Sequence, residues 1–285
     1  MRYAVFATLC VAGAMTLAGC EAPPKVDADR ALEGINVIDE SNLNDIMLTA
    51  ADPNEAVTYF KEASREQPDR IDLKRGLAKS LTRAKRPTEA VVVWAEVAAS
   101  DAVTADDRIG YAGALIRTGD WDRAEAELDR IPPTYETYDR YRLEAMVADS
   151  NREWERADSY YETAAGLTTR PAGVLNNWGY SKLTREDFAA AEDLFARAIT
   201  YDSGLFTAKN NLVLARAAQG NYTLPIVPMT QPEKAQLLHT LALSAIRRGD
   251  VDTGRRLLRD ALDTHPQHFE AAARSLEALD AGRYN

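Results

Sequence analysis

The chain has 285 residues, of which 46% are hydrophobic and 27% are charged, so it has enough apolar surface to fold around a core. It carries 34 Lys and Arg against 44 Asp and Glu, and the net charge of -10 opposes generic binding to nucleic acid phosphates. Both cysteines, Cys10 and Cys20, lie within the first 20 residues. The rest of the chain therefore offers no disulfide, no thiolate metal site and no catalytic thiol.

Residues 1–19 have the composition of a signal peptide. Arg2 gives a positive start, and residues 3–19 contain no charged side chain. The tetrapeptide Leu17-Ala18-Gly19-Cys20 resembles a bacterial lipobox, which implies cleavage before Cys20 and acylation of the Cys20 sulfur. A plain transmembrane anchor is the alternative, but so short a run rich in Ala and Gly is marginal for crossing a bilayer.

The lipobox implies a lipoprotein that faces the periplasm. Lipoproteins of enteric bacteria with Asp after the Cys tend to stay in the inner membrane, and this chain has Glu21, so we expect the outer membrane. Residues 20–36 are polar, contain Pro23-Pro24, and are predicted to form a flexible tether. We expect the folded region to extend over 37–285.

A repeat of about 34 residues runs through this region. A small leading residue is followed by a bulky side chain four positions later and by a small or apolar one three positions beyond. Small residues let antiparallel helices approach closely, and the bulky residue fills the space against the neighbouring unit. A helical bundle with accidental Ala spacing is the alternative. The predicted packing residues are Ala56, Ala90, Ala124, Ala157 and Ala191, spaced by 34, 34, 33 and 34, with Gly179, Phe195 and Ala198 completing the clearest unit.

This pattern resembles the tetratricopeptide repeat (TPR), which implies an all-α solenoid of about six helix hairpins. Single units would expose their apolar faces, so neighbouring units must stack, and a final capping helix is expected at 269–285. The units are expected near 37–70, 71–104, 105–137, 138–171, 172–205, 206–234 (incomplete) and 235–268.

The unit at 206–234 is predicted to lack its second helix. Residues 223–232 contain three prolines, which favour an extended segment. This segment is either a repaired defect or a docking element. Its apolar side chains are expected to pack where the missing helix would lie: Leu224, Ile226, Val227 and Met229.

Residues 176–270 resemble the TadD family, TPR lipoproteins of the Flp (tight-adherence) pilus system. The likeness rests on NNWGYSKLTREDFAAAEDLFARAI, YTLPIVPMTQ and HPQHFEAA. It implies a scaffold that helps the outer-membrane secretin and neighbouring assembly proteins. The alternative is a periplasmic adaptor or chaperone-like module for envelope or peptidoglycan-remodelling proteins.

In TPR arrays, unit positions 2, 5, 6, 9, 12 and 13 of the first helix line a groove. Asn177 and Asn211 both stand at position 6, preceded by Asn176 and Asn210, and a carboxamide can both donate to and accept from a peptide backbone. These asparagines are either a backbone clamp or a solvated surface. Tyr180 is the clearest groove aromatic, and the tryptophans fit hairpin packing better: Trp94, Trp121, Trp154 and Trp178.

A basic stripe is predicted on the second unit, where Arg75, Lys79 and Arg83 are spaced four residues apart. It is a candidate site for acidic peptides, C-terminal carboxylates or lipid head groups. The alternative is a solvated surface that Asp72 and nearby acids neutralise.

No motif indicates catalysis, a metal or a cofactor. His265 and His268 flank a proline between helices, without the further ligands that a metal site needs. The acidic pairs are expected to face solvent, with nothing to raise a pKa: Asp106-Asp107 and Glu125/Glu127. We therefore expect a non-enzymatic protein that binds protein partners.

Overall fold

The computed structural model describes residues 43–282; the predicted signal peptide, Cys20 and the tether lie outside the described residues. The chain divides into two compact units, residues 1–52 and 53–285. Residues 43–49 form a short helix in the first unit. This division falls inside the predicted repeat unit 37–70, so the pairing of its two helices stays a prediction.

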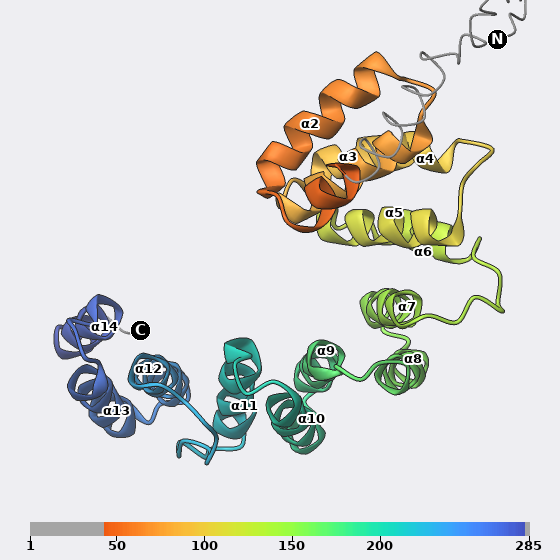
Figure 1. The fold of residues 1–285 in the computed structure, drawn as a ribbon. Coiled ribbons are helices and arrows are strands. Elements are labelled where there is room, and N and C mark those ends of the chain that lie inside the picture. The colour runs from red at the N-terminus through yellow and green to blue at the C-terminus, as the bar shows by residue number, and fades with distance from the viewer. Residues whose placement is uncertain (1–42, 283–285) are drawn as a thin grey trace, which may run out of the picture. The chain divides into compact units, whose positions relative to one another are not determined.

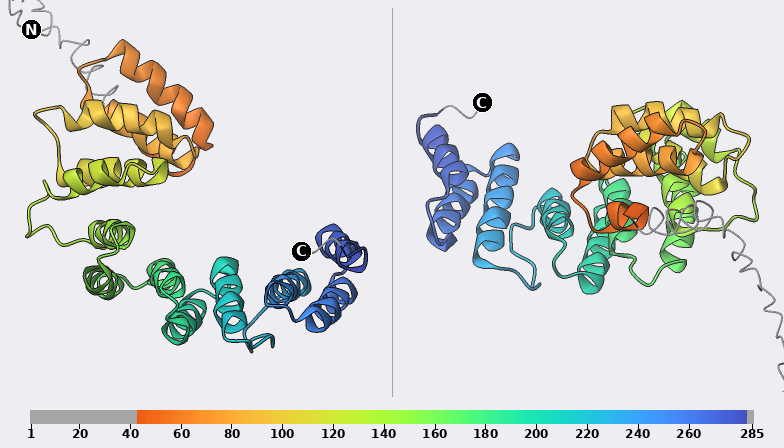
Figure 2. Two further views of the ribbon diagram at one scale, coloured as in Figure 1. Left: turned by 180° about the vertical axis from the view of Figure 1, so that it is seen from behind. Right: turned by 45° about the horizontal axis from the view of Figure 1, so that its top comes forward.

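The described part of the second unit is helical and contains no strand (Figure 1). Each helix packs on the next along the chain, and the order is easily followed in both further views (Figure 2). None of the described helices is both long and apolar enough to cross a membrane. The helices are α2 (Pro53–Glu66), α3 (Ile71–Arg83), α4 (Pro87–Ala98), α5 (Ala105–Thr118), α6 (Trp121–Leu128), α7 (Tyr138–Ser150), α8 (Trp154–Gly166), α9 (Ala172–Thr184), α10 (Phe188–Tyr201), α11 (Phe206–Ala218), α12 (Gln231–Arg247), α13 (Val251–Thr264) and α14 (Glu270–Asp280).

The first helices of five successive hairpins, α3, α5, α7, α9 and α11, begin at residues 71, 105, 138, 172 and 206, where the repeat spacing places them. The next one, α12, begins at Gln231, earlier than the predicted 235. Thr230 caps it by accepting a hydrogen bond from the Glu233 backbone N–H at 3.3 Å. Pro232 lies in the first turn, where a helix needs no N–H donor, so it opens this helix instead of preventing one.

One turn geometry recurs at the end of six of these first helices. In the turn after α5, Gly119 N–H bonds Ile116 C=O at 3.1 Å and Asp120 N–H bonds Leu115 C=O at 3.0 Å, which is a Schellman motif. The motif needs a left-handed residue, and glycine adopts that conformation without steric cost. Glycine occupies the position in only half of the turns; the six residues are Lys85, Gly119, Arg152, Glu186, Gly220 and Gly249.

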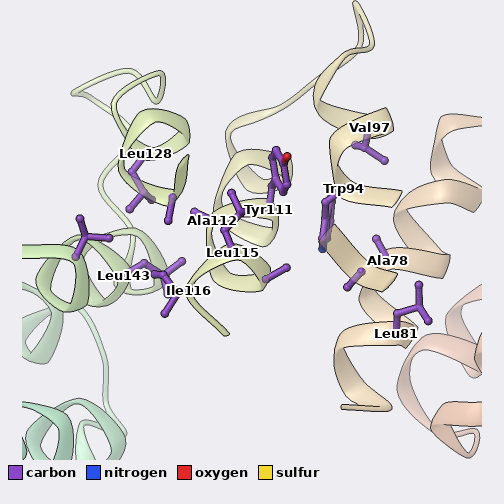
Figure 3. Close-up of a cluster of buried hydrophobic side chains, with 14 of the residues drawn as sticks. Ala78, Leu81, Trp94, Val97, Tyr111, Ala112, Leu115, Ile116, Leu128 and Leu143 are labelled. Carbon is purple, nitrogen blue, oxygen red and sulfur yellow. The ribbon is translucent and has the colours of Figure 1, made fainter. Parts of the chain in front are cut away.

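Aromatic side chains pack directly on small residues of the neighbouring helix. Trp94 of α4 faces Tyr111 of α5, and both are buried (Figure 3). A Cβ atom on Gly110 would lie 2.5 Å from Trp94 Cζ2, and one on Gly179 would lie 2.7 Å from Phe195 Cε1. The absence of a side chain thus sets how closely these helices approach. All eight predicted packing residues are buried, at the positions Ala56, Ala90, Ala124, Ala157, Gly179, Ala191, Phe195 and Ala198.

The proline-containing segment between α11 and α12 is not helical and packs against the solenoid. Leu224 and Met229 contact the cluster formed by α11 to α14, and Val227 contacts the cluster of α9 to α11. Ile226 was expected to pack as well, but its relative exposure is 105%. Its neighbour Pro225 is buried instead, and the chain bends at residues 226 and 227.

A buried ion pair joins the two helices that flank this segment. Lys209 of α11 is 2% exposed, and its Nζ donates to both carboxylate oxygens of Glu233, at 3.0 and 3.1 Å. Glu233 also accepts a hydrogen bond from the Thr230 backbone N–H at 2.7 Å. The pair therefore fixes the start of α12 against α11, where the missing helix would otherwise have filled the space.

Candidate protein-binding groove

The first helices of successive hairpins contact one another as well as their own partners: α7 packs on α9, and α9 packs on α11. Their exposed faces form the floor of a groove of about 530 Å³. The starts of α6 and α8 and one side chain from within α8 complete it. The lining residues are Trp121, Met146, Asp149, Ser150, Trp154, Tyr161, Asn176, Asn177, Tyr180, Ser181, Thr184, Thr207 and Asn211.

The groove asparagines are not equivalent. Asn211 is 8% exposed, and its Nδ2 donates to Asn176 Oδ1 at 3.1 Å. Asn177 is half-buried, and its Nδ2 lies 4.0 Å from Met146 Sδ. No other hydrogen bond reaches the Asn177 side chain from residues 43–282. Asn177 therefore presents an amide whose oxygen and nitrogen are both available to a ligand.

Asn210 lies outside this groove. Its Oδ1 accepts a hydrogen bond from Thr240 Oγ1 of α12 at 2.8 Å, so it joins two units. The four asparagines that the sequence singled out therefore have three different roles. Asn211 pairs with Asn176, Asn210 pairs with the next unit, and Asn177 faces the open groove.

The aromatic lining is larger than the sequence suggested. Tyr180 is 56% exposed, as expected for a groove residue. Trp121 and Trp154, which were predicted to pack within hairpins, also line the groove. Each is the first residue of a second helix, where its side chain reaches back toward the first-helix face. Trp178 is used internally, because its Nε1 donates to Asp158 at 2.6 Å.

A carboxylate lies in this groove without a cationic partner. Asp149 Oδ1 accepts from Ser181 Oγ at 2.6 Å, and Oδ2 accepts from Tyr161 Oη at 2.7 Å. Burial raises the pKa of Asp149 above its ordinary value, and these two hydrogen bonds only partly oppose the effect. Burial and the adjacent Asp149 also raise the pKa of Tyr161. Tyr161 is therefore a neutral hydrogen-bond donor to a carboxylate.

The nearest cations of α9 are engaged elsewhere. Lys182 Nζ lies 2.8 Å from Asp158 Oδ2, and Arg185 Nη2 lies 2.6 Å from Asp158 Oδ1. The guanidinium of Arg185 also covers the Trp154 ring, 5.2 Å from its centroid. In the part of the chain that the structure describes, no ion pair reaches Asp149. The direct hydrogen bonds to its carboxylate therefore come from neutral hydroxyl groups, and Arg185 acts on it only at longer range, which tends to lower its pKa.

The sequence contained a sign of Asp149 that was passed over. Counting Tyr138 as position 1, Asp149 is at position 12 of its unit, one of the groove positions. The sequence alone could not show that Asp149 lacks a direct ion pair, because Lys182 and Arg185 stand at nearby positions of the next repeat unit.

One residue of the predicted basic stripe, Arg75, is engaged in an ion pair within the solenoid. Arg75 Nε donates to Asp107 Oδ1 at 2.8 Å, and Arg75 Nη2 donates to Oδ2 at 2.8 Å. Lys79 is exposed and Arg83 is half-buried. The ion pair gives Arg75 a structural role between α3 and α5, and binding of acidic segments by the stripe stays a prediction.

Two carboxylates that were expected to face solvent are buried. Asp107 is 3% exposed and Glu127 is 7% exposed. Burial tends to raise the pKa of Asp107, but hydrogen bonds from Arg75 and Thr104 outweigh it and hold the pKa below its ordinary value. Glu127 accepts from Arg108 Nη1 at 2.7 Å. Both carboxylates are engaged in ion pairs, and residues 43–282 contain no cluster of three or more His, Cys, Asp or Glu that could hold a metal.

Helix hairpins that repeat about every 34 residues and present a groove on their first helices define an α-solenoid of the TPR type. Residues 48–108 match the tetratricopeptide repeat family model. No curated protein matches the sequence.

Solved structures share the fold at low identity. A chain of the APC/C hetero-tetramer Cut9-Hcn1 is 16% identical with a TM-score of 0.60, over 89% of this chain and 52% of that one, so this chain spans about half its length. PilW, titled a widely conserved type IV pilus biogenesis factor, is 13% identical with a TM-score of 0.57, over 82% and 96%. A TPR protein from Parabacteroides merdae is 11% identical with a TM-score of 0.54, over 89% and 98%.

Proposed function

We propose that the protein is a non-catalytic scaffold that binds an extended segment of a partner protein in the groove over α7, α9 and α11. The observation that carries the proposal is the open amide of Asn177, which lines the same groove as Tyr180, Trp121 and Trp154. An extended backbone offers one donor and one acceptor per residue, which a carboxamide can match without reading the side chain.

We also propose a cellular setting for this scaffold. Acylation of Cys20 would anchor it to the outer membrane, facing the periplasm, where it would support assembly of the Flp pilus and its secretin. The lipobox and the TadD-like stretch 176–270 support this setting. The fold likeness to PilW, whose title describes a type IV pilus biogenesis factor, is consistent with it.

A photo-crosslinking amino acid placed at Tyr180 tests both parts in the full lipidated protein. Tyr180 is in the groove and 56% exposed; Tyr201 on α10 is 61% exposed and lies outside the groove, so it is the matched control. We expect partner adducts from position 180 and few from position 201. Equal yields from both positions would contradict a groove-bound partner.

The identity of the crosslinked proteins tests the setting. Recovery of a secretin or a pilus subassembly, lost when Cys20→Ala releases the protein from the membrane, would support pilus assembly. Recovery of peptidoglycan enzymes, or of a broad set of envelope proteins without pilus components, would instead support the periplasmic adaptor function and overturn the pilus part.

A further inference from the structure

The carboxylate of Asp149 is the one groove feature that binding a plain peptide backbone does not explain. It is half-buried, it accepts hydrogen bonds only from hydroxyl groups, and no cation of the described residues pairs with it. Arg185 acts on Asp149 only at longer range, and leaving an ionised carboxylate partly desolvated without a direct ion pair costs free energy. A cation supplied by a ligand would offset that cost.

The surroundings of Asp149 suit a cation with an aliphatic stem. Trp121 and Tyr180 line the same groove, and aromatic faces attract ammonium and guanidinium groups while packing against methylene chains. Trp154 also lines the groove, with the guanidinium of Arg185 over its ring. The thioether of Met146 adds an adaptable apolar contact. Each oxygen of Asp149 uses one hydrogen bond and keeps a further acceptor site.

The local charges favour an incoming cation. Lys182 pairs with Asp158 and Asp187, Arg185 pairs with Asp158, and Arg142 Nη2 pairs with Asp139 at 3.1 Å, so each of these cations already contacts an acid other than Asp149. The whole chain is acidic, with a net charge of -10, which attracts basic partners at long range.

We infer that the groove selects a lysine or arginine side chain of the bound segment, which pairs with Asp149 between the groove aromatics while Asn177 holds the adjacent backbone. This inference rests on the proposed protein-binding function and adds its specificity. It gives the C-terminal half of the solenoid the opposite preference from the acidic segments predicted for the Arg75, Lys79 and Arg83 stripe.

The test uses capped octapeptide pools that are randomised except for one central position, fixed as lysine, arginine, norleucine or glutamate. Trp121 and Trp154 lie in the groove, so tryptophan fluorescence reports binding. For the unmodified protein we expect the lysine and arginine pools to bind about tenfold more tightly than norleucine, given the usual strength of charge-assisted hydrogen bonds and cation–π contacts. Glutamate should bind most weakly.

Asp149→Asn should reduce the preference for lysine over norleucine to less than about twofold, since the neutral amide no longer attracts a cation. Asp193→Asn changes the net charge equally at an exposed site on α10, whose side chain is 68% exposed, and should leave the preference unchanged. Tyr180→Ala, an exposed position that does not support the fold, should weaken the lysine pool about threefold.

The outcomes separate the two proposals. If all pools bind equally, or if the lysine preference survives in Asp149→Asn, the basic-side-chain inference is overturned while peptide binding stands. If no pool binds, both are overturned. A preference for glutamate would show that the groove recognises acidic segments, which also overturns the inference.

Discussion

Two pairs of first helices in this solenoid are joined by polar contacts of different kinds. Between α3 and α5, Arg75 binds Asp107, and between α7 and α9, Ser181 binds Asp149; both pairs are separated by 32 residues in the chain. In the first pair the carboxylate binds a guanidinium, so neither group is available to a ligand. In the second pair a carboxylate meets only hydroxyl groups, and its charge stays available to a ligand. Whether a polar residue supports the fold or the groove therefore depends on the residue about one repeat away.

The comparison also explains the opposite pKa directions of the two carboxylates. Burial tends to raise the pKa of both, but only Asp107 has a cation that reverses the effect. Asp107 should therefore stabilise the folded chain, whereas Asp149 should slightly destabilise it in the absence of a ligand. Substitutions at the two aspartates test this distinction.

The largest effect is expected from Asp107→Ala. The substitution leaves Arg75 without its partner and removes the capping box with Thr104, so we expect a loss of about 3 kcal/mol in the free energy of unfolding. Urea unfolding followed by circular dichroism measures it. Asp101→Ala, an exposed neighbour, should change stability by less than about 0.5 kcal/mol. A small effect of Asp107→Ala would show that the α3–α5 contact contributes no more to stability than the α7–α9 contact does.

A smaller gain in stability, equal in size, is expected from substitutions in the hairpin turns after α3 and after α9. Lys85 and Glu186 occupy the left-handed position of equivalent hairpin turns, with φ of 58° and 63°. Replacing either by Gly should relieve backbone strain and raise stability by about 0.5 to 1 kcal/mol. Gly119→Ala, at the same position of another turn, should lower it by a similar amount. Unequal gains at 85 and 186, measured by thermal unfolding, would show that the two turns are held differently.

The smallest effect, with the opposite sign to the first, is expected from Asp149→Asn. At neutral pH the substitution removes a half-buried charge that has no direct ion pair, so we expect a gain of about 0.5 kcal/mol. The folded-state pKa of Asp149 is raised, so the folded state binds the proton more tightly than the unfolded state does. The wild-type chain therefore gains stability as pH falls through this raised pKa, and its difference from Asp149→Asn should vanish there.

Asp107 should show the reverse pH dependence. Its folded-state pKa is lowered, so its contribution is present above the unfolded value and is lost only as pH falls through the folded value. Unfolding measured from neutral pH to pH 3 for both aspartate variants distinguishes the two cases. A loss of more than about 1 kcal/mol in Asp149→Asn at neutral pH would mean that this carboxylate is structural, like Asp107.

The incomplete unit shows how much of the fold could be predicted from the sequence. The prolines of 223–232 correctly excluded a helix in most of that segment, because they lack an N–H and clash with the preceding turn. Pro232 was misjudged, since the same residue is favourable in the first turn of α12. The Lys209–Glu233 pair was not foreseen, because burial of a lysine follows from packing and not from its local pattern.

The candidate site was only partly predictable. Asn177 and Tyr180 were identified because their unit positions place them on the groove face, and both line the groove. Trp121 and Trp154 were assigned to hairpin packing, because their unit position begins the second helix and its direction toward the groove depends on the neighbouring unit. Asp149 was overlooked, and its missing counter-ion appears only when α7, α8 and α9 are assembled.

The architecture of this protein follows from the pattern of its sequence. Small and bulky residues every 34 positions specify helix hairpins, because close helix approach demands small side chains at fixed intervals. The turns recur because the first helices end at nearly the same position of each unit. Only the tertiary structure decided which polar side chains are consumed in contacts between units and which stay open. Such contacts join residues about 30 to 35 positions apart, and their partners are chosen by the relative placement of neighbouring hairpins. Arg75 and Asn210 thereby became part of the framework, and Asn177 and Asp149 became the groove.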